Sequence, residues 1–176
     1  MQRIIPVLAI LALPLSAQEH PNARPAFIQL NLDMPSQGLK GHVGNQVGSG
    51  CSLGYVLHGT ADGGTTFALK LDADDFSNDS TRHEAHGVGV GVELTIYPHS
   101  GMGGLYVSVA PSLHFWSLTD REKGALTNQQ YVRSGGTVAL GYRFTPRFSV
   151  EAHWKSATLD QDLQISSYGL GVKLHF

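Results

Sequence analysis

The sequence has little charge of either sign and a single cysteine. Charged residues make up 15% of the 176 positions and the formal net charge is −2, whereas about 25% charge is usual in soluble domains. The few basic residues form no cluster, which argues against a nucleic-acid-binding surface. Cys51 has no partner within the chain, so an internal disulfide framework is excluded.

The chain also lacks any apolar run long enough for a membrane-spanning helix. The longest such run, residues 4–15, follows Arg3 and leads into Leu15-Ser16-Ala17. A short apolar segment between a basic residue and a small-residue site is typical of a secretory signal peptide. We therefore expect a signal peptide over residues 1–17, cleaved after Ala17, and one exported domain over residues 18–176.

Glycine is abundant, with 21 residues, and the dominant period of the apolar pattern is two. In residues 167–176 every second position is large and apolar, which is the pattern of a strand with one apolar face. Similar alternation predicts about eight strands of the length that tilted membrane strands need. The expected strands are residues 27–34, 46–58, 65–74, 87–97, 105–116, 137–144, 148–155 and 167–176.

The links between these strands alternate in length. Long polar loops are expected at residues 35–45, 73–86 and 117–130, and short turns at 59–64, 98–104 and 145–147; the link at 157–163 is intermediate. Long links at one end and short links at the other are typical of an up-and-down barrel whose short turns face the periplasm. The long loops would then be the places where the protein meets partners.

The apolar face is too bulky for the inside of a small barrel, whereas the glycine-rich face would fit there. Aromatic residues also gather at the strand ends, as in the two girdles of a membrane barrel. Tyr142, Phe144 and Phe148 lie toward the short turns, and Phe115 and Trp154 toward the long links. These features predict an all-β, eight-stranded antiparallel up-and-down transmembrane β-barrel.

Three stretches resemble a known family: "GVGVGVELTIYP" from residue 87, "ALGYRF" from residue 139 and "SSYGLGVKLHF" from residue 166. With the leader, they resemble the small eight-stranded outer-membrane barrels of the outer-membrane protein A and X type. The resemblance implies an outer-membrane location and a terminal strand read as an assembly signal by the barrel-insertion machinery. That role would fall on Tyr168, Leu170, Val172, Leu174 and Phe176.

Several charged residues fall on the face expected to line the lumen. Charges in a narrow interior must pair or be hydrated, so we expect an ion-pair network centred on Glu93, Arg143, Glu151 and Lys173. Lys70 and Lys155 share that face. The network would plug the lumen, and the sharper alternative is a gate for small solutes.

Nine histidines raise the question of a metal site. His83 and His86 flank Glu84 in "HEAH", which is one residue short of the His-Glu-x-x-His zinc motif and has no helical pattern around it. His20, His42 and His99 are expected to be exposed loop residues. We therefore expect no metal site, no cofactor and no catalytic residue.

The expected function is that of a non-enzymatic integral outer-membrane barrel with a structural or surface-interaction role. Its partners would be outer-membrane lipid and lipopolysaccharide, the barrel-assembly machinery and periplasmic chaperones, and the chain would be a monomer. One alternative is a lipid A-modifying enzyme that uses His153, Ser156 and Glu151, although His153 and Ser156 fall on opposite strand faces. The other is a soluble periplasmic β-barrel that binds an apolar ligand.

Overall fold

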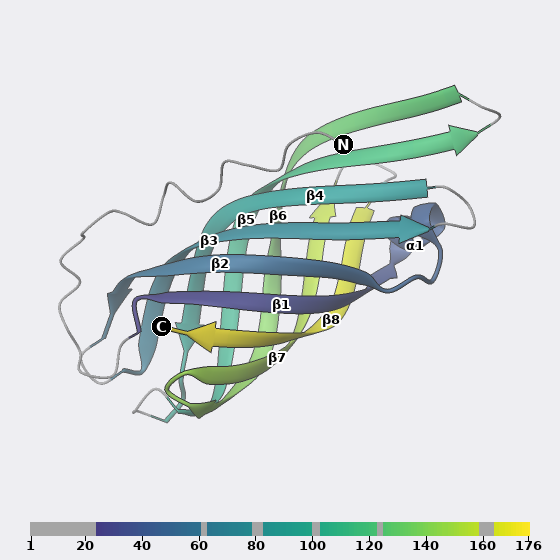
Figure 1. Ribbon diagram of the computed structural model, residues 1–176. Helices are drawn as coiled ribbons and strands as arrows, with labels where there is room; N and C mark the ends of the chain where they lie inside the picture. Colours follow the sequence, from purple (N-terminus) through teal and green to yellow (C-terminus); the bar gives the residue numbers. More distant parts are fainter. Residues whose placement is uncertain (1–23, 61–62, 79–82, 100–102, 123–124, 159–163) are drawn as a thin grey trace.

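The computed structural model describes residues 24–60, 63–78, 83–99, 103–122, 125–158 and 164–176, so the expected signal peptide and Ala17 lie outside the described residues. Eight antiparallel strands follow one another around a closed barrel in chain order (Figure 1). They are β1 (Ala26–Ser36), β2 (Gly48–Gly59), β3 (Thr65–Asn78), β4 (His83–Ile96), β5 (Gly104–Glu122), β6 (Ala125–Thr145), β7 (Phe148–Thr158) and β8 (Gln164–His175). The predicted fold class is confirmed: this is an eight-stranded, all-β, up-and-down barrel.

The barrel closes between its first and last strands. β1 pairs with β8 from Phe27 opposite His175 to Ser36 opposite Ser166. Beyond that ladder, the backbones of Ala26 and Phe176 exchange two hydrogen bonds of 3.1 and 2.9 Å. Closure therefore pairs the inner parts of all eight strands on both sides, as a bilayer requires of a sheet.

Alternating residues divide between the two faces as the period of two requires. In β1 and β8, for example, Leu30, Leu32 and Leu170 are more than 60% exposed, whereas Asn31 and Lys173 are buried in the interior. The outer face is therefore apolar and the inner face polar, and the same division holds around the whole barrel.

One end of the barrel differs from the sequence-based expectation. Residues 73–86 and 117–130 were predicted to be long loops, but β3 and β4 pair as far as Asn78 opposite His83, and β5 and β6 as far as Glu122 opposite Ala125. The sequence pattern did not predict these strand ends, because strands outside the apolar band need no apolar outer face and so show no regular apolar alternation. Figure 1 shows the β5–β6 hairpin extending beyond the other strands.

The expected loop at residues 35–45 contains a short helix, α1 (Gln37–Val43). Leu39 and Val43 project from it into an apolar cluster at the mouth of the barrel. The other members of this cluster, here called the apolar cap, are Phe76, Ala85, Trp116, Leu118 and Ile165. His42, expected in a loop, lies in α1, and its ring is 5.2 Å from the ring of His83 in β4. Within the described residues, no helix is long and apolar enough to cross a bilayer.

Glycine makes room for aromatic rings inside the barrel. A Cβ atom on Gly141 would collide with the ring of Tyr106, and one on Gly54 would collide with the ring of Phe27. Tyr106 faces Gly141 across the β5–β6 ladder, and Phe27 faces Gly54 across the β1–β2 ladder. These pairs allow two large side chains to fill a narrow interior.

We predict that Gly141→Ala lowers the free energy of unfolding by about 1–3 kcal/mol, the usual cost of overpacking. Denaturant unfolding in detergent micelles, followed by tryptophan fluorescence, measures this change. Gly41→Ala is the control, since a Cβ there meets no atom within 4 Å and lies in α1. Equal destabilisation of the two variants would contradict the packing argument.

Candidate functional site

The barrel interior holds nearly all of the buried charge among the described residues. Five carboxylates and four basic side chains are buried there, so the interior charge is close to balanced. The carboxylates belong to Asp33, Asp72, Asp74, Glu93 and Glu151, and the basic groups to Lys70, Arg143, Lys155 and Lys173. This interior is therefore the candidate site.

A chain of alternating charges, here called the central network, connects four strands. Lys173 Nζ lies 2.9 Å from Glu93 Oε1 and 3.1 Å from Glu151 Oε1. Lys70 Nζ lies 3.4 Å from Glu93 Oε2 and also 3.4 Å from Asp72 Oδ1. Each lysine thus bridges two carboxylates, which offsets the cost of removing these charges from water.

Neutral polar groups extend this network toward β1. The Ser52 hydroxyl donates to Asp72 over 2.6 Å, and Asn31 Nδ2 donates to Ser52 over 3.4 Å. Gln29 Nε2 in turn donates to Asn31 Oδ1 over 2.7 Å. Hydrogen bonds of this kind keep the buried carboxylate in a fixed orientation.

A second group, here called the upper cluster, lies closer to the apolar cap. Lys155 Nζ lies 2.6 Å from Asp74 Oδ1 and 3.4 Å from Asp33 Oδ2. His153 Nε2 lies 2.6 Å from Asp33 Oδ1. The upper cluster joins β1, β3 and β7, so ion pairs cross the lumen at two levels.

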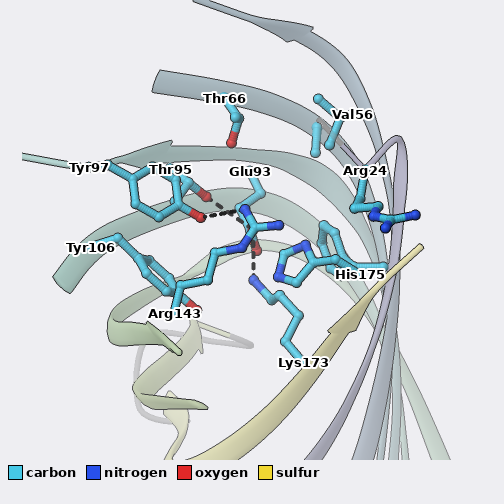
Figure 2. Close-up of a pocket in the computed structure, with 12 residues that line it drawn as sticks. Arg24, Val56, Thr66, Glu93, Thr95, Tyr97, Tyr106, Arg143, Lys173 and His175 are labelled. Carbon is cyan, nitrogen blue, oxygen red and sulfur yellow. Dashed lines mark hydrogen bonds and ion pairs between the residues drawn. The ribbon is translucent and has the colours of Figure 1, made fainter. Parts of the chain in front are cut away.

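The structure brings together three of the four residues expected to form one network. Glu93, Glu151 and Lys173 meet in the central network, but Arg143 does not join them. Its guanidinium donates to the hydroxyl of Tyr97 (Figure 2). It also donates to the carbonyl oxygens of Thr145 and Pro146. Within the described residues no carboxylate oxygen lies within 4.0 Å of it.

The expectation for Arg143 failed because alternation places a residue on a face but does not give its height in the barrel. Arg143 is next to the short turn, where backbone carbonyls are free to accept. Conversely, Asp33, Asp72, Asp74 and His153 were missed as members of an ion-pair system. The available signal was that all four lie on the inward-facing positions of their strands.

The histidine and catalytic candidates do not assemble into reactive sites. His86 lies at the exposed end of β4, 3.3 Å from Asp75 and 3.7 Å from Glu84, and no group of three potential metal ligands occurs in the described parts of the chain. His153 is engaged with Asp33 in the lumen, whereas the hydroxyl of Ser156 accepts a hydrogen bond from Gln164. His153 and Ser156 thus have different partners.

Two small cavities interrupt the interior. The larger lies at the short-turn mouth and offers about 20 Å³ to the centres of water molecules, enough for about one or two waters. The smaller lies under the apolar cap, beside His114 and Lys155, and offers about 10 Å³.

The residues expected to face lipid lie on the outer face. Phe115, Trp154, Tyr142 and Phe144 are exposed, and Phe148 is half-buried. The ring centroid of Phe144 lies 4.8 Å from that of Tyr142 and 5.8 Å from that of Phe148. The short-turn end of the barrel therefore carries a continuous aromatic patch. The side chains of the expected assembly signal also point outward: Tyr168, Leu170, Val172, Leu174 and Phe176.

We predict that Lys173→Met lowers the free energy of unfolding by about 3–5 kcal/mol, because it leaves buried carboxylates short of a cation. Denaturant titration in micelles measures the loss. Lys40→Met on the exposed side of α1 is the matched control and should change stability by less than about 0.5 kcal/mol. Addition of Glu151→Gln to Lys173→Met should recover part of the loss; no recovery would contradict the ion-pair argument.

Comparison with known proteins identifies the architecture but no close relative. No family model and no curated protein sequence matches the chain. Among solved structures, Neisserial surface protein A matches with a TM-score of 0.61 and 16% identity, over 86% of this chain and 97% of that one. The N-terminal β-barrel domain of Pseudomonas aeruginosa OprF matches with a TM-score of 0.60 and 19% identity, over 85% and 97%.

A third match is Ail, the attachment invasion locus protein of Yersinia pestis. Its TM-score is 0.62 at 11% identity, with coverage of 86% of this chain and 96% of that one. Another structure describes Ail as an outer membrane protein in a phospholipid bilayer nanodisc. At these identities the likeness shows the fold alone: the chain has the fold of small eight-stranded outer-membrane barrels.

Proposed function

We propose that this chain is a non-enzymatic integral outer-membrane barrel with a plugged polar lumen, which presents a surface for interactions outside the membrane. The observation that carries this proposal is the placement of side chains. Large apolar residues cover the outside and charged residues fill the inside. Soluble proteins rarely expose such a continuous apolar surface, whereas lipid requires one.

The interior supports a plug rather than a channel. Both cavities are small, and ion pairs cross the lumen at two levels. Above them lies the apolar cap, to which α1 contributes Leu39 and Val43. A solute would have to break several buried ion pairs at once to pass.

The β5–β6 hairpin supports a surface-interaction role. β6 pairs with β7 only from Gly135 to Thr145, so residues 125–134 have a ladder partner on β5 alone among the described residues. Asn128, Gln129 and Gln130 are exposed there. Exposed polar groups that project beyond the other strands can contact another protein.

Partners follow from the two faces. Outer-membrane lipid and lipopolysaccharide would surround the apolar band, and the barrel-assembly machinery and periplasmic chaperones would handle the chain before insertion. The closed barrel offers no strand edge within the band, which favours a monomer. The buried basic groups face the lumen rather than an outer surface, so we propose no nucleic-acid partner.

The two alternative functions have less support. A lipid A-modifying enzyme would need its catalytic groups to reach lipid, but His153 and Glu151 are buried in the lumen. A soluble barrel would need an apolar interior, but Leu170, Val172 and Leu174 point outward. The geometry of the described residues therefore favours the membrane barrel.

Cysteine labelling on intact cells tests the location and the orientation. In a Cys51→Ser background, we expect Asn128→Cys in the hairpin to react with a membrane-impermeant maleimide. Arg147→Cys in the opposite turn should react only after lysis, because the short turns face the periplasm. Labelling of Arg147→Cys alone, or release of the protein by osmotic shock, would refute the proposal.

Conductance in planar bilayers tests the plug. We expect Glu93→Gln to leave the current unchanged from that of the wild type, because the ion pairs of Lys155 still cross the lumen above it. Lys40→Gln is the control, because it removes one charge from the exposed side of α1 and leaves the charges in the lumen unchanged. A rise in current specific to Glu93→Gln would favour a gate instead.

A further inference from the structure

The cavity at the short-turn mouth has an unusual lining. Figure 2 shows Arg24 before β1, Arg143 on β6 and His175 on β8 around the same space. Lys173 and Glu93 also line it. Three separate parts of the chain therefore bring nitrogen-bearing side chains to one opening.

The charges around this cavity are not balanced. Glu93 is the only carboxylate in the lining, and Lys70 and Lys173 already bind it. Arg24 and Arg143 have no carboxylate oxygen within 4.0 Å among the described residues. The mouth thus carries two cations whose charge the central network leaves uncompensated.

Arg143 is held in place by neutral groups. It is 5% exposed, and its bonds run to the carbonyls of Thr145 and Pro146 and to the hydroxyl of Tyr97. A guanidinium has five N–H donors, so these contacts fix its plane without using all of them. A fixed guanidinium fork is well suited to oxygens of a phosphate.

Further donors lie in the same lining. The hydroxyl of Tyr106 is buried and has no hydrogen-bond partner among the described residues. The side chain of Thr66 also lines the cavity. The mouth therefore combines a buried, charged and oriented donor, a second arginine and neutral hydroxyls.

We propose that a phosphate group binds at the opening of this cavity, at the mouth of the barrel between Arg143 and Arg24, with the small enclosed space left for water. The group could belong to a free phosphate or a phosphate monoester, or to the diester head group of a phospholipid, since all present the same oxygens. This inference goes beyond the proposed surface role and does not depend on it.

Isothermal titration of the purified barrel in octyl glucoside, a detergent without phosphate, tests the proposal with inorganic phosphate as the probe. We expect saturable binding that Arg143→Gln weakens about tenfold or more, the effect of losing a charged hydrogen bond. Arg24→Gln should also weaken it. Arg147→Gln is the matched control, since Arg147 is exposed on the same turn and lies outside the lining.

Arg24 precedes the first strand, so Arg24→Gln keeps the test valid if Arg143→Gln fails to fold, which circular dichroism and gel migration reveal. Dimethyl phosphate in a parallel titration distinguishes the sources: tighter binding than inorganic phosphate indicates a lipid head group, weaker binding a free phosphate or monoester. Absence of binding to both probes, or equal loss in Arg147→Gln and Arg24→Gln, overturns the proposal. Neither result would affect the cysteine labelling that tests the membrane location.

Discussion

Closure of the hydrogen-bonded ladder between β1 and β8 is the constraint on which the rest of the structure depends. Inside a bilayer no water is present to satisfy an open strand edge, so every inner strand must be paired on both sides. A closed sheet with a period of two then separates its residues into an outer and an inner set. The apolar exterior and the charged interior are therefore two results of one geometric condition.

A narrow closed interior has to be filled by a limited set of side chains. Glycines opposite Tyr106 and Phe27 leave space for rings, and lysines bridge pairs of carboxylates at two heights. Since unpaired buried charges are costly, each of these buried lysines lies between two carboxylates. Arg24 and Arg143 at the short-turn mouth are the exception, because no carboxylate of the network pairs with either guanidinium among the described residues.

The sequence was sufficient to predict the strands within the apolar band, since an exposed apolar face on one side and a packed lumen on the other impose strict alternation. It was not sufficient for the parts above the band. The outer ends of β3–β6 have a largely polar outer face and only a few apolar residues on the inner face, among them Phe76 and Trp116. The helix α1 is only seven residues long, so neither part produces a clear periodic signal. Nor could alternation pair the charges: Asp33 meets His153 only because the stagger of β1, β8 and β7 sets them at one height.

The pairing of Phe27 with His175 and of Ala26 with Phe176 has a kinetic consequence. These contacts join the two ends of the barrel chain, so they contribute the largest possible sequence separation. Because closing so long a loop costs chain entropy, we expect this pairing to form after the intervening hairpins. Until β1 and β8 pair, the incomplete sheet has two unpaired strand edges, which can pair with other chains and aggregate. Rapid closure of the barrel would limit that aggregation.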